Sequence, residues 1–216
     1  MDQPNPAERI VVKTFPVGPL QCNCSIIGDT LTGLAVLVDP GGDAELILKE
    51  LDDMGLKVVS IIHTHAHLDH ILAAGEIKKA TGAPIYLHEG DMFLWEGVAE
   101  QCQMFGVPPV KLPKPDHFIN DDQDLGCCGG VALHTPGHTP GSTSFWFDQC
   151  NTLIAGDTLF RGSIGRTDLW GGNFESIVDS IKERLYTLDD DATVITGHGP
   201  STKIGVEKET NMFVRG

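Results

Sequence analysis

The segment over residues 61–70 most constrains what this chain can fold into, because it holds four of the nine histidines directly behind an apolar run. That apolar run predicts a buried strand over residues 57–62 that leads into the histidines. Imidazole nitrogens and a carboxylate at such close spacing are donors that a transition metal binds. The donors in this segment are His65, His67, Asp69 and His70. We therefore interpret the rest of the chain as a scaffold for this loop.

Hydrophobic periodicity predicts strands and helices that alternate along the chain. The predicted strands cover residues 9–14, 24–28, 34–38, 57–62, 84–87, 131–135, 142–147, 152–155 and 194–196. The predicted helices run from the N-cap Asp43 to Gly55 and over residues 71–80, 89–101, 174–188 and 206–213. Strands followed by a helix, twice over, favour a mixed α/β (α+β) layered fold and leave its topology open. We expect residues 1–216 to form a single domain.

Three further loops share one pattern, a metal-binding side chain directly after a predicted strand and surrounded by glycine and proline. They are residues 135–142 around His138, residues 155–160 around Asp157 and residues 196–200 around His198. Glycine allows the backbone to approach its neighbours closely, so each loop can direct one side chain at a common point. With the first segment, the donors number five histidines and two aspartates. That set is large enough for two metal ions that share one bridging group.

Such a site predicts hydrolysis. Two divalent ions about 3.5–4 Å apart lower the pKa of a shared water to near neutrality, which supplies a hydroxide nucleophile. A metal ion also polarises the scissile carbonyl and stabilises the developing oxyanion. A thiolate leaving group needs little protonation because its pKa is low. We expect two divalent metal ions, zinc first with iron or manganese as alternatives, because imidazole and carboxylate suit all three.

The motif Thr64-His65-x-His67-x-Asp69-His70, followed by the three glycine-rich loops in this order, resembles the metallo-β-lactamase superfamily over essentially the whole chain. The resemblance implies an αββα sandwich, with two mixed sheets face to face and the metals at one edge. It implies that one metal is bound by His65, His67 and His138, and the other by Asp69, His70 and His198. It also implies that Asp157 bridges both metals. On this basis Asp69 and Asp157 are the predicted catalytic residues, with Asp69 as a metal ligand that orients the hydroxide.

Two segments, residues 156–168 and 197–202, resemble the short bacterial branch of the glyoxalase II-type hydrolases. That family hydrolyses hydroxyacylglutathione thioesters, so the resemblance implies cleavage of S-acylglutathione, such as S-lactoylglutathione, by a metal-bridging hydroxide. Glyoxalase II proper carries a C-terminal helical region with glutathione contacts, whereas this sequence stops at Gly216. We therefore expect the thioesterase chemistry to transfer better than the glutathione specificity.

Other activities compete with this interpretation. Residues 165–168 also resemble persulfide dioxygenases, which use one iron held by two histidines and a carboxylate. The histidine at position 198, a ligand of the second metal, favours the hydrolase over the dioxygenase. Cleavage of a lactone or a β-lactam is a further alternative. A non-enzymatic binding module is a third class, but such a module would not need all seven ligands.

Several residues near the motif are predicted to support the site. His63 precedes the motif, so we expect it to end the strand or to hydrogen-bond a ligand histidine. Asp39, in an Asp-Pro-Gly-Gly loop that resembles one common in the superfamily, is expected to support the metals indirectly. Two roles are open for Arg161, Arg166 and Asp168. Either an ion pair among them holds the loop after Asp157, or one of the arginines binds a substrate carboxylate.

The remaining histidines and the aromatic residues are interpreted as structural. They include His88, His117, His134, Trp146 and Trp170. The six cysteines form no Cys-x-x-Cys pair, so we expect reduced thiols.

The net charge of -15 at pH 7 would repel a phosphate backbone, so we expect a small-molecule thioester as the partner and no nucleic acid. Residues 1–6 carry no basic or apolar leader pattern, and no stretch is long and apolar enough to span a bilayer. We therefore expect a cytoplasmic protein with no membrane partner. The sequence leaves the oligomeric state open.

Overall fold

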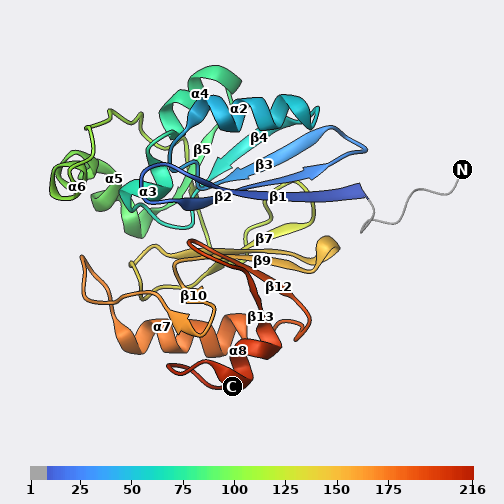
Figure 1. Ribbon diagram of the computed structural model, residues 1–216, viewed down its shortest axis with the longest axis vertical. Helices are drawn as coiled ribbons and strands as arrows, with labels where there is room; N and C mark the ends of the chain where they lie inside the picture. Colours follow the sequence, from blue (N-terminus) through green and yellow to red (C-terminus); the bar gives the residue numbers. More distant parts are fainter. Residues whose placement is uncertain (1–8) are drawn as a thin grey trace, which may run out of the picture.

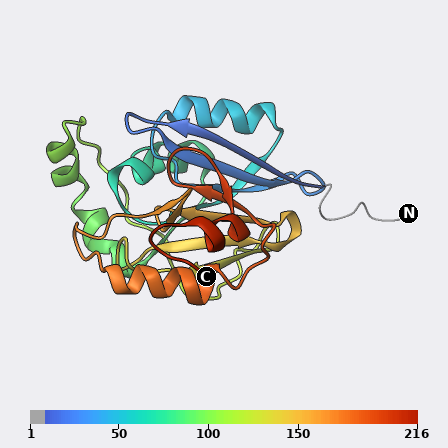
Figure 2. The same cartoon turned by 60° about the horizontal axis from the view of Figure 1, so that its bottom comes forward.

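Two β-sheets lie face to face at the centre of the molecule, with helices on their outer faces (Figure 1). The computed structural model describes residues 9–216, so residues 1–6, on which part of the localisation prediction rests, lie outside the described residues. Helices α2 (Ala44–Asp53) and α4 (Ala74–Thr81) cover the first sheet. Helices α7 (Phe174–Ser180) and α8 (Ile204–Thr210) cover the second. Figure 2 shows the cyan helix α2 and the orange helix α7 again on opposite sides. The predicted αββα sandwich is confirmed.

The first sheet has six strands in sequence order. They are β1 (Ile10–Val17), β2 (Cys22–Asp29), β3 (Leu34–Val38), β4 (Lys57–Ile62), β5 (Ile85–His88) and β6 (His117–Ile119). Strands β1 to β3 pair antiparallel, whereas β3 to β6 pair parallel. Parallel strands end at the same edge of a sheet, so the loops after β3 and β4 adjoin. The backbone N–H of Asp39 donates to the carbonyl of Ile62 at 3.1 Å and holds these two loops together.

The second sheet has five strands in the order β13-β12-β9-β8-β7. They are β7 (Gly130–His134), β8 (Thr143–Phe147), β9 (Thr152–Gly156), β12 (Thr193–Thr196) and β13 (Thr202–Lys203). Strands β9 and β12 are parallel, so the loops that follow them adjoin. A small ribbon of β10 (Leu159–Phe160) and β11 (Ser163–Ile164) extends from the loop after β9.

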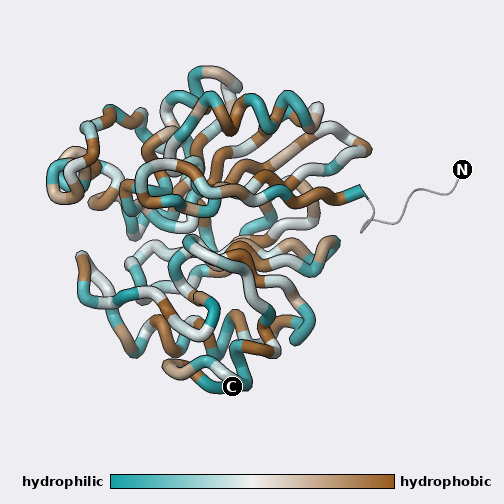
Figure 3. The backbone as a smooth tube through the Cα atoms, viewed as in Figure 1, coloured by the Kyte–Doolittle hydropathy of each residue, from teal (hydrophilic) through white to brown (hydrophobic). Residues whose placement is uncertain are grey.

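Strand periodicity distributes the apolar side chains between two layers of core. Successive residues of a strand point to opposite faces, so Ile61 packs under the helices of the first sheet while Ile62 packs between the sheets. The second sheet sends Phe145 and Ile154 into the same central layer. Figure 3 shows the result, with brown, hydrophobic segments along the strands and teal segments on the outer helices. Because both faces of each sheet are covered, these strands read as continuous apolar runs.

Four predicted helices differ from the observed ones. The helix predicted over residues 71–80 is divided into α3 (Leu68–Ile71) and α4, because the N–H of Ala73 donates to the carbonyl of Pro40 at 2.9 Å instead of continuing the helix. The helix predicted over residues 89–101 becomes η1 (Glu89–Asp91), α5 (Met92–Glu96) and α6 (Val98–Phe105). The helix predicted over residues 174–188 ends in a π-helical turn, η3 (Ile181–Leu185), and the terminal helix predicted over residues 206–213 is instead α8.

The predicted N-cap at Asp43 is correct in position but not in chemistry. Asp43 has φ of 48° and makes no side-chain capping bond to α2. Its carboxylate instead accepts a hydrogen bond from the N–H of Gly18 at 2.8 Å. Strands β6, β10, β11 and β13 escaped prediction because two or three residues carry no periodicity. Across residues 9–216, no helix has the length and apolarity needed to cross a membrane.

We predict that Phe145→Ala lowers the free energy of unfolding by about 3–5 kcal/mol, because the fully buried ring fills the layer between the sheets. Urea denaturation followed by circular dichroism measures the change. Phe105→Ala is the matched control, since its ring is 44% exposed on α6, and we expect a change within about 0.5 kcal/mol. Equal effects of the two substitutions would contradict the central packing layer.

Candidate metal centre

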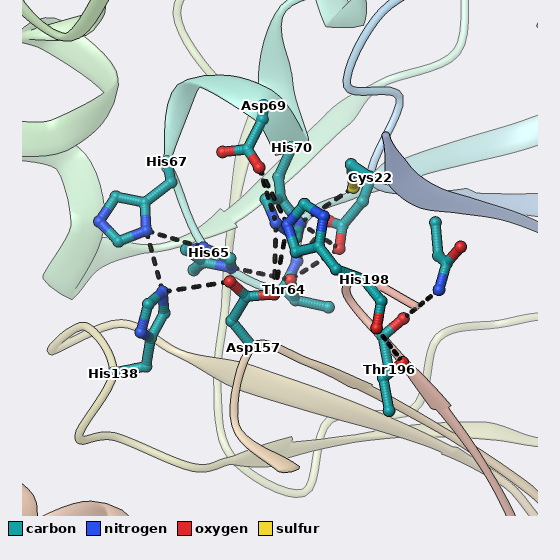
Figure 4. A network of polar contacts seen from close by, with 12 residues as sticks. Cys22, Thr64, His65, His67, Asp69, His70, His138, Asp157, Thr196 and His198 are labelled. Atoms are coloured by element: carbon teal, nitrogen blue, oxygen red, sulfur yellow. Dashed lines mark hydrogen bonds and ion pairs between the residues drawn. The ribbon is translucent and has the colours of Figure 1, made fainter. Parts of the chain in front are cut away.

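Side chains from four loops converge at one edge of the two sheets (Figure 4). The loop after β4 contributes four of them, and the loops after β7, β9 and β12 contribute one each. They are His65, His67, Asp69, His70, His138, Asp157 and His198. The structure thus brings together all seven residues that the sequence predicted to be metal ligands. Each loop begins where a buried strand ends, so the sheets fix its position.

Three imidazole nitrogens form the first donor group. Nδ1 of His67 lies 3.0 Å from Nε2 of His65 and 2.9 Å from Nε2 of His138. The opposite nitrogens of two rings have partners that fix their protons. Nδ1 of His65 donates to Oγ1 of Thr64 at 3.1 Å, and Nδ1 of His138 donates to the carbonyl of Arg166 at 2.8 Å. Both Nε2 atoms therefore present lone pairs to His67, an arrangement suited to a shared cation.

Burial keeps the rings of His65 and His67 neutral. Desolvation, followed by the neighbouring histidines, holds the pKa of His65 well below its usual range. Desolvation, followed by the charge of His138, lowers the pKa of His67 to about 3. A neutral imidazole is the form that binds a metal, so at pH 7 no proton has to be removed from these two rings before binding.

The second donor group combines two imidazoles with a carboxylate. Oδ2 of Asp69 lies 3.0 Å from Nε2 of His198 and 3.7 Å from Nε2 of His70. Asp157 stands between the two groups, with Oδ1 3.5 Å from Nε2 of His70 and Oδ2 3.6 Å from Nε2 of His138. One carboxylate thus presents one oxygen to each group.

Several buried donor atoms in this cluster lack a hydrogen-bond partner among the described residues. They include Nε2 of His70 and Oδ1 of Asp157, which lie 3.5 Å apart. Buried polar atoms are normally paired, and binding of an ion is one of the standard explanations for an exception. The residues present therefore fit a pair of bound metal ions.

Asp39 braces the first loop from below. Its carboxylate accepts hydrogen bonds from the N–H of Thr64 at 2.8 Å, from Oγ1 of Thr64 at 2.7 Å and from Nδ1 of His70 at 3.0 Å. Nδ1 of His63 donates to the carbonyl of His70 at 3.1 Å. The bond from His70 to Asp39 directs the other nitrogen of that ring, Nε2, toward Asp69 and Asp157.

Comparison with known proteins identifies the family. Residues 17–198 match the family model described as the metallo-beta-lactamase superfamily. The chain belongs to this superfamily. Hydroxyacylglutathione hydrolase GloC of Haemophilus influenzae is 39% identical over 207 residues, which cover 94% of this chain and 97% of that protein. The chain is thus a metal-dependent hydrolase of this superfamily, with histidine and aspartate candidates for a divalent metal site.

Two solved structures resemble this one closely. The B3 metallo-beta-lactamase BLEG-1 is 36% identical, with a TM-score of 0.88, and the match covers 95% of this chain and 100% of that one. The di-iron-bound form of TTHA1623 is 36% identical, with a TM-score of 0.86, over 94% of this chain and 100% of that one.

The sequence analysis missed the residues that connect the ligand loops of this chain. The buried carboxylate of Asp91 accepts hydrogen bonds from the N–H of Ala66 at 3.0 Å, the N–H of Gly141 at 2.6 Å and Oγ1 of Thr139 at 2.8 Å. It therefore connects the loop after β4 to the loop after β7, across the two sheets. No motif marks this residue, because its partners lie 25 to 50 positions away.

Two more residues hold ligand loops without a sequence signal. Gln101 accepts from the N–H of Leu68 at 3.0 Å and donates to the carbonyl of Ala66 at 3.1 Å. Asn23 donates to the carbonyls of Thr196 and Gly199, both at 2.9 Å, and so secures the loop of the last histidine.

The loop after Asp157 shows an ion pair. The guanidinium of Arg166 donates to Asp168 through Nε at 2.8 Å and Nη2 at 2.9 Å, and both side chains are exposed. Within the described residues Arg161 forms no ion pair and is also exposed. Exposed pairs contribute little to stability, so the more important contact of this loop is the Arg166 carbonyl that holds His138.

Other side chains are placed as follows. The ring of Trp170, which we interpreted as packing, has its centroid 5.9 Å from that of His67 and so borders the donor cluster. The rings of His88 and His134 stack on each other at 4.1 Å, and His117 packs against Tyr86 at 4.9 Å. The six cysteines are free, and Sγ of Cys22 lies 3.4 Å from Nδ1 of His70.

We predict that Asp91→Asn lowers metal content and destabilises the fold by about 1–3 kcal/mol, because the new amide leaves at least one buried donor without an acceptor. Metal analysis after gel filtration and urea denaturation measure the two effects. Glu89→Gln is the matched control, since this carboxylate is exposed on the same 3-10 turn. Unchanged metal content in Asp91→Asn would show that the two ligand loops need no such connection.

Proposed function

We propose that this chain hydrolyses thioesters of the S-acylglutathione type, such as S-lactoylglutathione, at two divalent metal ions. The observation that carries the proposal is the pair of complete donor groups that share Asp157. The likeness to GloC, which is described as a hydroxyacylglutathione hydrolase, supports the choice of substrate. We propose zinc as the metal, with iron and manganese as alternatives, because imidazole and carboxylate donors suit all three.

In this proposal His65, His67 and His138 would hold one ion and Asp69, His70 and His198 would hold the other, and Asp157 would serve both. When bound, such a pair supplies a hydroxide nucleophile at neutral pH and an electrophile for the carbonyl. The protein's own part is to fix the donors before the substrate arrives. Asp39 fixes His70, and the Arg166 carbonyl fixes His138.

Asp69 also has a task in positioning the attacking water. Its carboxylate is largely buried, and its Oδ2 faces the imidazoles of His70 and His198. We propose that it accepts a proton of the nucleophile in a hydrogen bond and so directs the lone pair at the carbonyl. The thiolate product needs no strong general acid because thiols are comparatively acidic.

The second donor group favours a hydrolase over an oxidoreductase. A dioxygenase with one iron held by two histidines and a carboxylate has no use for a further set. In this chain Asp69, His70 and His198 form that further set, with donor atoms within 4.8 Å of one another.

We further propose a cytoplasmic protein that acts on a small molecule. Six free cysteines suit a reducing compartment, and the charge of -15 disfavours nucleic acid as a partner.

We predict that the purified protein holds two metal ions per chain and cleaves S-lactoylglutathione. His67→Ala and Asp157→Ala should each lower the metal content, and kcat/KM should fall by more than about 100-fold, beyond the loss typical of outer partners. Metal analysis and the absorbance of the released thiol after reaction with a disulfide reagent measure these quantities. His88→Ala is the matched control, because this ring stacks on His134 outside the donor cluster.

Two outcomes would overturn this function. One is a fully metal-loaded protein that cleaves no thioester. The other is one iron per chain together with oxygen uptake in the presence of glutathione persulfide, which would assign the chain to the dioxygenases.

A further inference from the structure

A cavity of about 200 Å³ opens beside the metal centre, between helices α5 and α6 and the loop at Trp170. Its lining consists mainly of apolar side chains, namely Phe93, Leu94, Met104 and Trp170, with Gly97, Glu100 and Gln101. Figure 1 places α5 and α6 next to α3, at the end of the sandwich where the ligand loops lie. Phe93 is 49% exposed and Met104 is 63% exposed, so large apolar surfaces remain open to water here.

Two residues of the lining, Trp170 and Gln101, border the donor loop, although no donor side chain itself lines the cavity. The ring of Trp170 forms one wall and lies 5.9 Å, between centroids, from the ring of His67. Gln101 forms part of the floor and is hydrogen-bonded to the backbone of Ala66 and Leu68, on either side of that histidine. A group in this cavity therefore lies within reach of a bond that is broken at the metals.

The floor of the cavity offers a ligand no free polar group. The amide oxygen of Gln101 accepts from Leu68, and its nitrogen donates to the carbonyls of Ala66 at 3.1 Å and Leu94 at 2.8 Å. Two further polar groups belong to the lining, namely the exposed, negatively charged carboxylate of Glu100 and the indole N–H of Trp170. A carboxylate, such as either end of glutathione, is repelled by the charge of Glu100 and gains no hydrogen bond from Gln101.

Size restricts the occupant further. A cavity of about 150 Å³ lined by apolar side chains accommodates benzene. The cavity described here is somewhat larger, so it suits one aromatic ring or a branched aliphatic group of similar volume. Larger hollows of about 640 and 610 Å³ lie beside Val110, but their linings include neither Trp170 nor Gln101, the two residues that border the donor loop.

We propose that this cavity receives the acyl group of the substrate, and that the acyl group is apolar and about the size of a phenyl ring. The inference rests on the proposed thioesterase function, because it assigns one side of the scissile bond to the cavity. The hydrophilic thiol then points away from α5 and α6 toward solvent. Phe93 and Met104 become buried on binding, which provides the driving force.

A series of thioesters with one thiol tests this assignment. We expect kcat/KM for S-phenylacetylglutathione to exceed that for S-acetylglutathione by roughly tenfold or more. Phe93→Ala should remove most of this preference, because it should lower kcat/KM for the phenylacetyl thioester far more than for the acetyl thioester. Phe105→Ala is the matched control, because this phenylalanine has similar exposure, 44%, on the end of α6 outside the cavity. A flat series, or equal effects of the two substitutions, would overturn the proposal.

A second series varies the thiol at constant acetyl group. The decisive comparison is between a thioester of an apolar thiol, such as benzyl mercaptan, and a glutathione thioester of an apolar acyl group. If Phe93→Ala lowers kcat/KM for the first thioester and not for the second, the cavity holds the leaving group and the proposal is wrong.

Direct binding separates this proposal from the thioesterase function. Phenylacetate, titrated by calorimetry into the zinc-loaded protein, should bind more tightly than acetate by roughly tenfold. Phe93→Ala should abolish the difference, and Phe105→Ala should preserve it. If the protein cleaves no thioester but this pattern holds, the proposed function fails and the apolar cavity stands. If both carboxylates bind equally, the cavity assignment fails whether or not thioesters are cleaved.

Discussion

The desolvation of five imidazoles and two carboxylates at one sheet edge is the constraint on which the rest of this structure depends. Polar groups of this kind are costly to bury without partners, and several of their nitrogens and oxygens face one another instead of hydrogen-bonding. The fold holds the donor residues in place nevertheless, because they lie directly after buried strands of the two sheets. In His65 and His138 the inward-facing nitrogens keep free lone pairs, because the outer nitrogens of these rings already donate hydrogen bonds.

The seven donors were predictable from sequence because each lies in a short local pattern that needs no tertiary information. A strand, a glycine-rich turn and a histidine or aspartate are enough to recognise them, whereas the αββα architecture was implied by the resemblance to the metallo-β-lactamase superfamily. The supporting residues were not predictable in this way. Asp91 and Gln101 act on backbone groups more than 20 residues away, so only the folded chain shows their partners.

Some helix boundaries were predicted wrongly for a related reason. The segment after the histidine motif has good local helix pattern, yet a hydrogen bond from Ala73 to Pro40, in the loop after another strand, interrupts it. Tertiary contacts overrode local propensity there. Trp170 was likewise judged by residue type alone, whereas its position beside His67 comes from the path of the loop after β11. In each case the missing information was the identity of the distant neighbour.

The segment formed by η1, α5 and α6 has two faces with different roles. Inward, Asp91 and Gln101 are buried and bound to the ligand loops, whereas outward, Phe93 and Met104 are exposed and make up the wall of a cavity. Substitutions on the outward face leave the hydrogen bonds of the inward face untouched. The side chains of this short segment that hold the ligand loops are thus distinct from the exposed ones that line the cavity. Enzymes of this type can therefore change the cavity, and with it the substrate, without disturbing the catalytic metals.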